Sequence, residues 1–278
     1  MIVVNTVAAL NAALSGCPKE GIGFVPTMGA LHNGHRSLVE RARKENSTVV
    51  VSVFVNPTQF NDKNDLKNYP RTPEADCAVL DSAGADIVFM PSVEDIYPEP
   101  DTRVFDFGLV DKVMEGATRP GHFNGVAQVV SRLFALVNPA RAYFGEKDFQ
   151  QIAVIKAMVE QLNIDIDIVE CAIVRGEDGL ALSSRNELLT PEHRAAAPHI
   201  YATIKQCAEK MATMTPAELT EWVVATIDSN PLLKTIYFEA VDARTMQRVE
   251  CWNDSERIQG CCAVQAGAIR LIDNIKIK

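Results

Sequence analysis

The sequence contains cysteines but no pairing pattern among them. The seven cysteines are scattered, odd in number, and include no C-x-x-C pair. This arrangement argues against a disulfide framework and against a zinc knuckle. Cys261 and Cys262 are adjacent, but neighbouring side chains of a strand point to opposite faces. We therefore expect buried, free thiols in a reducing compartment.

An excess of positive charge is also missing. The 27 Lys and Arg residues are outnumbered by 36 Asp and Glu, which gives a formal net charge of -9 at pH 7. Nucleic acids and anionic membranes select basic surfaces, so neither is an expected partner. An anionic small molecule is still compatible with this balance, because a few Arg, Lys and His side chains can make one pocket positive.

No segment for export or membrane insertion is expected either. The opening residues, MIVVNTVAALNAAL, have no basic region, and Asn5 and Asn11 interrupt their apolar run. We expect neither a signal peptide nor a membrane span there. The composition, 47% hydrophobic and 23% charged, is ordinary for a globular enzyme. Together these features predict a cytoplasmic protein.

Strand and helix signals alternate through the first part of the chain. Residues 49–55 (VVVSVFV) are apolar almost throughout, which is typical of a strand buried on both faces. Such alternation predicts an α/β fold, a Rossmann-like parallel sheet with helices on both faces. Further strands are expected at 23–26, 86–90 and 141–144, and helices at 34–46, 73–83, 124–137 and 148–162.

The pattern changes after about residue 175. A turn-rich GEDG segment leads to LSSRN, and two helices are then expected, at 191–211 and 216–227. Thr190 and Thr215 are suitable N-caps, each followed by proline. We expect a Rossmann-like domain over residues 1–175 and a smaller α+β C-terminal domain over residues 176–278. The expected strands of the second domain are 236–241, 262–265 and 268–272.

The most informative motif is PTMGALHNGH, at residues 26–35, between a short apolar strand and an amphipathic helix. Gly29 and Gly34 allow a ligand to approach the backbone closely. A helix N-terminus suits phosphate, because its N–H groups are unpaired and its dipole end is positive. His32 and His35 would face the same side of the helix and could donate hydrogen bonds to phosphoryl oxygens.

The two histidines have alternative interpretations. They could be structural turn residues, or a zinc pair, although two histidines alone do not complete a zinc site. The His-x-Gly-His element resembles the signature of the nucleotidyltransferase superfamily that includes class I aminoacyl-tRNA synthetases, and that resemblance implies ATP binding and adenylyl transfer. Neither a G-x-x-x-x-G-K-[ST] loop nor a G-x-G-x-x-G fingerprint occurs, so kinase and dehydrogenase functions lack their usual support.

FVNPTQF, at residues 54–60, follows the most apolar strand. Ligands of open α/β sheets bind beyond the carboxyl ends of the strands. The uncharged amides of Asn56 and Gln59 suit a hydroxyl-bearing acid. Ordinary turn formation by Asn-Pro is the alternative explanation.

Two later motifs carry phosphate-binding chemistry. FGEKDFQQ, at residues 144–151, offers the mobile cation of Lys147 and places Gln151 in a helix. LSSRN, at residues 182–186, combines two serine hydroxyls with a guanidinium. Taken singly, each could instead be an exposed polar loop, the first with Asp148 as a helix cap.

Seven segments together resemble the pantothenate synthetase family, in the order PTMGALHNGH, FVNPTQF, DLKNYPRT, RPGHFNGV, FGEKDFQQ, DGLALSSRN and RLIDNI. The resemblance runs from about residue 2 to residue 276, and the combination of FVNPTQF, FGEKDFQQ and DGLALSSRN is specific. It implies an ATP-dependent condensation of (R)-pantoate with β-alanine, through a pantoyl adenylate, with release of AMP and pyrophosphate. It also implies a homodimer whose C-terminal domain acts as a lid.

The resemblance further implies residue roles. His35 matches the family's proton donor, and we expect His35, His32 and Lys147 to be catalytic. Gln59 and Gln151 would hold pantoate, and Gln59 would also meet β-alanine. A magnesium ion would accompany the ATP phosphates, with protein ligands that the sequence does not identify. The ATP-binding residues would be Met28, Gly29, Ala30, Leu31, His32, Asn33, Gly34, His35, Gly145, Glu146, Lys147, Asp148, Val174, Leu182, Ser183, Ser184 and Arg185.

Two other functions compete with this interpretation. An adenylyltransferase acting on a phosphate in coenzyme biosynthesis would use the same His-x-Gly-His element, but it gives no reason for FVNPTQF. A non-catalytic nucleotide sensor should have lost its phosphate-contacting groups, whereas both histidines, the lysine and the arginine are present.

Overall fold

The computed structural model describes all 278 residues, and the chain divides into two compact units. Unit 1 comprises Met1–Phe107, Arg119–Glu146 and Val154–Ala172. Unit 2 comprises Gly108–Thr118, Lys147–Ala153 and Ile173–Lys278. Two short internal segments thus pack with the C-terminal part of the chain and not with their neighbours in sequence.

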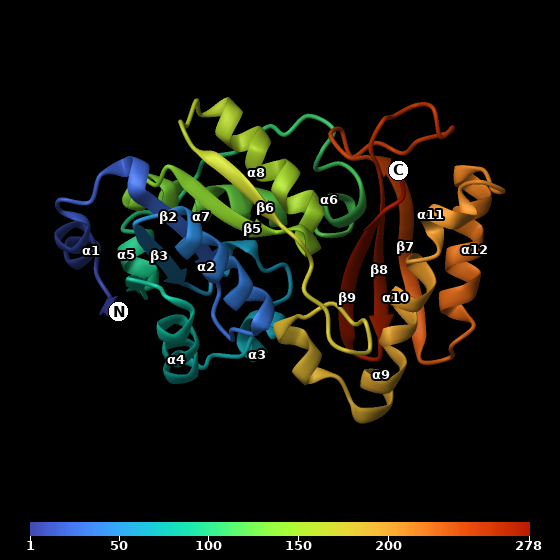
Figure 1. The fold of residues 1–278 in the computed structure, drawn as a ribbon, viewed down its shortest axis with the longest axis horizontal. Coiled ribbons are helices and arrows are strands. Elements are labelled where there is room, and N and C mark those ends of the chain that lie inside the picture. Colours follow the sequence, from blue (N-terminus) through green and yellow to red (C-terminus); the bar gives the residue numbers. More distant parts are fainter. The chain divides into compact units, whose positions relative to one another are not determined.

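Unit 1 contains a six-stranded sheet of order β1-β4-β3-β2-β5-β6, in which every strand pair is parallel (Figure 1). This arrangement confirms the predicted parallel α/β fold. The chain passes outward from β2 through β3 to β4 and then returns to place β5 on the other side of β2. Such a switch point is where open α/β sheets bind their ligands. The strands are β1 (Ile2–Val4), β2 (Ile22–Thr27), β3 (Thr48–Val53), β4 (Ile87–Phe89), β5 (Arg141–Gly145) and β6 (Asp167–Cys171).

Helices cover both faces of this sheet. On one face, α2 (Asn33–Glu45) and α4 (Pro73–Ala83) pack on a core that includes Val25. Phe24, the preceding residue of β2, points the opposite way and meets Phe134 of α7 (His122–Val137) edge-on, with ring centroids 6.3 Å apart. The other helices of this part are α1 (Val7–Leu14), α3 (Lys63–Asn68), α5 (Val93–Ile96) and α8 (Phe149–Gln161), whose first residues belong to unit 2.

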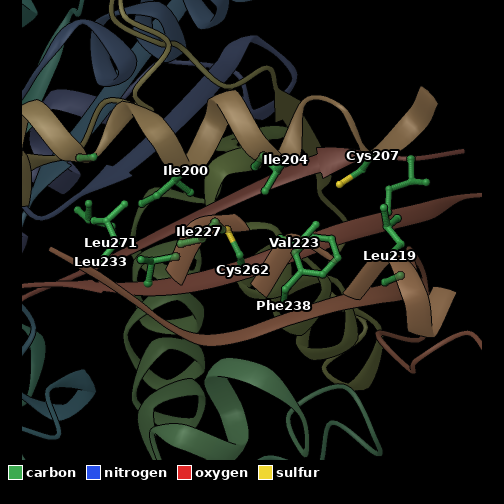
Figure 2. Packing of buried hydrophobic residues seen from close by; sticks show 14 of the residues in the cluster. Ile200, Ile204, Cys207, Leu219, Val223, Ile227, Leu233, Phe238, Cys262 and Leu271 are labelled. Atoms are coloured by element: carbon green, nitrogen blue, oxygen red, sulfur yellow. The ribbon is translucent and has the colours of Figure 1, made fainter. Parts of the chain in front are cut away.

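Unit 2 is built on an antiparallel sheet of order β7-β8-β9. Its main core lies between this sheet and the C-terminal helices, where Ile204, Val223, Phe238 and Cys262 are buried together (Figure 2). The elements are α6 (Met114–Thr118), α9 (Pro191–Ala196), α10 (Pro198–Ile204), α11 (Cys207–Lys210), α12 (Pro216–Asp228), β7 (Leu233–Asp242), β8 (Ile258–Ala266) and β9 (Ile269–Lys276).

The second face of this sheet is also covered. Cys261 packs there with Met114 and Met246, against Phe149, while Cys262 belongs to the core on the opposite face. The opposite orientation of the two thiols is therefore confirmed. All seven cysteines are free. The expectation of buried thiols is wrong for Cys251, which is exposed, and for Cys17 and Cys77, which are only partly buried.

Helix boundaries in unit 2 show where local signals were sufficient. The Thr190 hydroxyl accepts a hydrogen bond from the His193 amide, and Thr215 forms a reciprocal capping box with Glu218, so both N-caps are confirmed. The single helix expected over 191–211 is wrong, because the chain forms three short helices there. Pro198 starts α10, and a proline cannot supply the N–H that would continue the preceding helix. No helix is long and apolar enough to cross a bilayer.

Candidate active site

The first motif forms a strained turn between β2 and α2. Gly29 and Ala30 both have positive φ, 80° and 50°. The turn is held by Asp76 of α4, which is 2% exposed and accepts hydrogen bonds from the amides of Ala30 (3.1 Å) and Leu31 (2.8 Å). Gly29 is required here, because a Cβ atom would lie 2.9 Å from the Asp76 carboxylate. Sequence reasoning missed Asp76, which lies 46 residues beyond Ala30.

The hydrogen bonds to Asp76 affect which groups of the turn could bind phosphate. The carboxylate of Asp76 already receives the N–H groups of Ala30 and Leu31. The hydroxyl of Thr72 donates to the same carboxylate at 3.1 Å. Within this motif His32 and His35, and not the amides of Ala30 and Leu31, are therefore the candidates for contact with phosphate.

His32 and His35 lie at the start of α2 with their ring centroids 4.1 Å apart. The Nδ1 atom of His32 accepts a hydrogen bond from the Gly34 amide at 3.1 Å. The Nδ1 atom of His35 accepts one from the His32 amide at 3.4 Å, the long end of the range. A ring nitrogen that accepts cannot carry the proton, so each neutral ring has its proton on Nε2. In each neutral ring Nε2–H is then the donor group.

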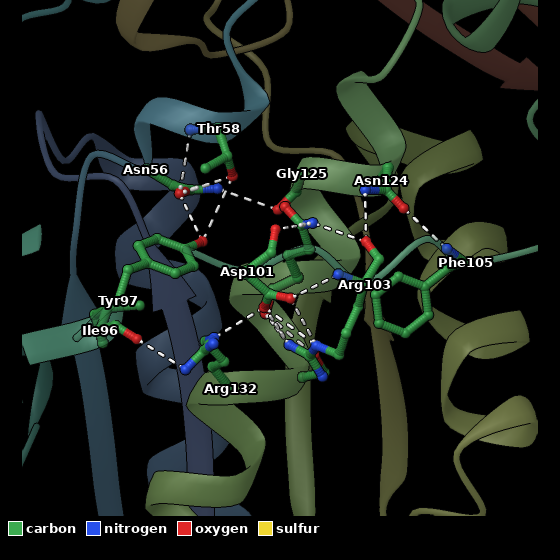
Figure 3. Close-up of polar contacts among 12 residues, drawn as sticks. Asn56, Thr58, Ile96, Tyr97, Asp101, Arg103, Phe105, Asn124, Gly125 and Arg132 are labelled. Atoms are coloured by element: carbon green, nitrogen blue, oxygen red, sulfur yellow. Dashed lines mark hydrogen bonds and ion pairs between the residues drawn. The ribbon is translucent and has the colours of Figure 1, made fainter. Parts of the chain in front are cut away.

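Asn56, beyond the end of β3, is the centre of a second cluster in unit 1 and is 1% exposed. Its Nδ2 donates to the Gln59 Oε1 at 3.2 Å and to the Gly125 carbonyl at 3.1 Å. Its Oδ1 accepts from the Tyr97 hydroxyl at 2.9 Å, as Figure 3 shows. Since Asn56 also caps the 3₁₀ turn Pro57–Gln59, its amide is used inside the protein and orients Gln59.

Gln59 links the first two motifs. Its Nε2 donates to the Met28 Sδ at 3.0 Å. Its backbone carbonyl is 2.8 Å from the His122 Nδ1, and the His122 Nε2 is 3.1 Å from the Arg119 Nη1. A guanidinium can only donate, so Nε2 accepts and Nδ1–H donates to Gln59. His122 belongs to the quoted RPGHFNGV motif, to which sequence reasoning assigned no role.

The segment before α7 is fixed to that helix by charge. The Asp101 carboxylate accepts from Arg103 (2.6 Å) and from Arg132 (2.9 Å) (Figure 3). The hydrogen bond from Arg103, helped by Arg132, holds the pKa of Asp101 well below its usual value despite burial. The Arg132 guanidinium also lies 5.2 Å from the centre of the Tyr97 ring. This network therefore steadies the tyrosine that donates to Asn56.

Lys147 belongs to unit 2 and lies in the 3₁₀ turn Glu146–Asp148. Its side chain is 19% exposed, and Nζ is 3.8 Å from the Asp148 carboxylate. The backbone carbonyl of Lys147 accepts a hydrogen bond from the Asn274 Nδ2 at 3.0 Å. Gln151 follows in the first turn of α8.

The LSSRN segment is an ordered hairpin end and not a loose linker. The Leu182 amide donates to the Val174 carbonyl at 3.0 Å, which brings these two predicted ATP-binding residues together. The Ser183 Oγ accepts from the Arg185 amide at 3.3 Å and caps the 3₁₀ turn Ser184–Leu188. The hydroxyl of Ser183 thus has a structural use beside any contact with phosphate.

The predicted site residues are divided between the two units. Unit 1 holds Met28 to His35, Gln59, Gly145 and Glu146, and unit 2 holds Lys147, Asp148, Gln151, Val174 and Leu182 to Arg185. Within unit 1 the structure brings Met28 to Gln59 and His32 to His35. Within unit 2 it joins Val174 to Leu182.

The donor groups do not form a protein cage for a metal ion. No cluster of three or more His, Cys, Asp or Glu side chains has a suitable arrangement. Magnesium commonly binds through phosphate oxygens and water with few protein ligands.

Comparison with known proteins supplies an independent line of evidence. The sequence model of a family described as "Pantoate-beta-alanine ligase" matches residues 2–276. A curated pantothenate synthetase of Porphyromonas gingivalis is 57% identical over 278 residues, covering 99% of each chain. The pantothenate synthetase of Bacteroides fragilis is 55% identical over 280 residues, covering 100% of this chain and 99% of that one.

Solved structures agree with these relatives. A pantothenate synthetase from Thermus thermophilus superposes with a TM-score of 0.94 at 46% identity, covering 100% of this chain and 99% of the other. A pantoate-beta-alanine ligase from Francisella tularensis, complexed with beta-gamma ATP and beta-alanine, has a TM-score of 0.84 at 37% identity. In that case 100% of this chain and 98% of the other are covered.

Proposed function

This chain belongs to the pantoate–β-alanine ligase family, and we propose that the residues described above carry out its reaction in two steps, through a pantoyl adenylate. The enzyme is an ATP-dependent ligase that joins pantoate to β-alanine by a C–N bond. The observation that most supports the proposed mechanism is the His32–His35 pair, whose Nδ1 atoms both accept backbone hydrogen bonds. That arrangement places the proton of each neutral ring on Nε2, the atom that would donate to the phosphates of ATP.

In the first step the pantoate carboxylate attacks the α-phosphorus of ATP, and pyrophosphate leaves. The carboxylate is already ionised at neutral pH, so no base is needed. The difficulty is that one anion attacks another, which calls for donors and positive charge around the phosphates. We assign that work to His32, His35 and Lys147, with His35 as proton donor. The remaining ATP contacts of the proposal are the other residues of 28–35, Gly145, Glu146, Asp148, Val174 and Leu182 to Arg185.

In the second step the free amine of β-alanine attacks the acyl carbon, the amide bond forms, and AMP leaves with the bonding electrons. The ammonium must first lose a proton, and we assign no side chain to that task. An acyl adenylate hydrolyses readily, so water must be excluded until β-alanine attacks the acyl carbon. We propose that the C-terminal part of the chain, from about residue 176, serves as the lid that does this.

We propose that a magnesium ion binds together with the phosphates of ATP. When bound, it would neutralise part of their charge. The absence of a carboxylate cluster suits an ion held chiefly by the nucleotide. No protein ligand is assigned to it.

A homodimer and a cytoplasmic location complete the proposal. An exposed apolar side chain supports the dimer, because Val104 is 84% exposed although the next residue, Phe105, is buried. Monomeric mass in light scattering at micromolar concentration would exclude the dimer. Fractionation of the native cells would test the location.

The proposed function is tested by isotope exchange between pyrophosphate and ATP. The phosphate-binding groups all serve attack at the α-phosphorus, which needs pantoate but no amine. We expect labelled pyrophosphate to enter ATP when pantoate and magnesium are supplied without β-alanine, and the exchange to stop when pantoate is omitted. Rapid quenching should recover pantoyl adenylate, and a covalent acyl-enzyme is not expected.

The same assay separates the competing functions. An adenylyltransferase would keep AMP in its product, whereas this ligase should release AMP once β-alanine is added. A nucleotide sensor would show no exchange at all. Exchange that required β-alanine would exclude a free-standing adenylation step and replace the mechanism proposed here.

Gln59 and Gln151 are proposed to hold pantoate, with Gln59 also meeting β-alanine. Replacing either by alanine should raise the KM for pantoate by roughly 10–100-fold, the range expected when a substrate hydroxyl loses its partner. The affinity for ATP should change little. Gln161→Ala, at the exposed end of the same helix as Gln151, is the matched control. Calorimetry that shows equal losses of ATP and pantoate binding would contradict these roles.

A further inference from the structure

The RLIDNI motif places two buried polar residues side by side in β9. Asp273 is 5% exposed and Asn274 is 3% exposed, although β9 is an edge strand of its sheet. Neighbouring side chains of a strand point to opposite faces. Asn274 pairs across the sheet with Cys261, which packs in the core with Met114 and Met246. Asp273 pairs with Cys262, which packs in the main core on the other face of the sheet. The two residues therefore serve different faces of the same sheet.

Asn274 holds the backbone of Lys147, the lysine proposed to bind phosphate. Its Nδ2 donates to the Lys147 carbonyl at 3.0 Å, across 127 residues of sequence. The orientation of the amide is fixed by Gln259, whose Nε2 donates to the Asn274 Oδ1 at 2.7 Å. With the oxygen receiving that donor, the amide nitrogen must face the carbonyl of Lys147.

Asp273 holds the other proposed phosphate-binding segment of unit 2. Its carboxylate receives two hydrogen bonds from the Arg175 guanidinium, at 2.6 and 2.8 Å. Arg175 also donates to the Gly179 carbonyl at 3.2 Å and lies 3.7 Å from the centre of the Tyr201 ring. Arg175 pairs with Ala181, directly beside the hydrogen bond that joins Leu182 to Val174.

We propose that Asp273 and Asn274 are positioning residues for adenylation, with Asn274 setting the place of Lys147 and Asp273 that of the Val174–Leu182 hairpin. One strand thereby fixes two segments that are far apart in sequence. The inference rests on the proposed role of Lys147 in binding phosphate. Neither residue is assigned a contact with substrate, so each acts through the segment that it holds.

The physical reason is the sensitivity of charge stabilisation to distance. A 3₁₀ turn of three residues has few hydrogen bonds of its own, so the bond from Asn274 helps to fix the Lys147 backbone. Displacement of a phosphate-binding group by about 1 Å can cost on the order of 10²-fold in rate. A buried apolar side chain could fill the space of Asn274 but could not hold the carbonyl.

A double-mutant cycle in the full-length enzyme tests the part played by Asn274. Asn274→Asp keeps the shape of the side chain and its acceptor for Gln259 but removes the donor to Lys147. We expect it to lower the maximal rate of pyrophosphate exchange by about 10-fold or more, with the KM for pantoate within about 2-fold of normal. In a Lys147→Ala background the same substitution should cost less than about 2-fold, because the group that it positions is gone.

Gln247→Glu is the matched control, because it also removes an amide donor to a backbone carbonyl of unit 2, that of Leu109. It should leave exchange unchanged in both backgrounds. Asn274→Ala is a second variant that adds no charge, and it should give the same pattern. Thermal melting of each variant separates a positioning effect from loss of the fold.

The possible outcomes are distinct. An equal loss from Asn274→Asp or Asn274→Ala in both backgrounds would overturn the inference, since the effect would then not pass through Lys147. A loss matched by the fraction unfolded would overturn it as well. Normal exchange in Lys147→Ala alone would instead overturn the proposed role of the lysine, whatever Asn274 does.

Discussion

Replacing His35 by alanine is expected to lower turnover by roughly 10²–10⁴-fold while the fold stays intact, the usual size of effect for a positioned hydrogen-bond or proton donor. The His35 ring is held at the start of α2 by the backbone amide of His32, at 3.4 Å from Nδ1. Its Nε2–H is the donor that we propose for the phosphates as charge moves onto them. Alanine removes that donor and offers nothing in its place.

The stability cost of this change should be small. His35 completes the capping box of α2, and loss of a cap contributes about 0.5–2 kcal/mol. The melting temperature should therefore fall by only a few degrees, and steady-state turnover should be measured on enzyme shown to be folded. His35→Gln, which can place an amide donor near the position of Nε2, should recover part of the rate. His193→Ala, a histidine outside the proposed site, is the control, and near-normal turnover in His35→Ala would remove His35 from the mechanism.

Replacing Lys147 by alanine should weaken adenylation by several kcal/mol at most, or on the order of 10²–10³-fold, as expected for a lost phosphate-binding charge. The pantoate-dependent exchange of pyrophosphate measures this step directly. The affinity for pantoate should change little, because the proposed role of Lys147 is to bind phosphate. Truncation leaves the Lys147 backbone carbonyl available to Asn274, so the turn should keep its place.

Two controls make the Lys147 result specific. Lys156→Ala removes a lysine of α8 that is paired with Glu170, and it should leave exchange normal. Lys147→Arg keeps the charge with a different shape and should retain part of the rate. A Lys147→Ala enzyme that forms adenylate at the normal rate and fails only in making the amide would show that the lysine serves the second step.

Local sequence signals were sufficient where the governing interaction is itself local. The β-branched run at 49–55 predicted the central strand Thr48–Val53, because both faces of that strand are buried. Thr215 predicted the start of α12 because a cap and its partner lie three residues apart. The same kind of signal was available in Pro198, which lies inside the helix expected over 191–211. A proline inside a helix removes an N–H donor, so Pro198 divides that segment into separate helices.

For site residues whose partners lie far away in the sequence, local signals did not identify those partners. The sequence pointed to Gln59 and Lys147 by their motifs, but it did not indicate what holds them. His122 supports Gln59 from 63 residues away, and Asn274 supports Lys147 from 127 residues away. Asp76 likewise fixes the turn of the first motif from another helix. No periodicity or turn chemistry links such pairs, because they meet only when the sheets have formed.

The sequence by itself determined the kinds of element, their order, the α/β class and the motifs that place the chain in its family, because each depends on side chains within a few residues of one another. Only the tertiary structure decided that residues 108–118 and 147–153 pack with the C-terminal sheet. It also decided which nitrogen of each site histidine carries the proton, since that depends on backbone donors brought there by folding. Burial and hydrogen bonding between distant segments arise only when the core has assembled, so local sequence patterns do not predict them.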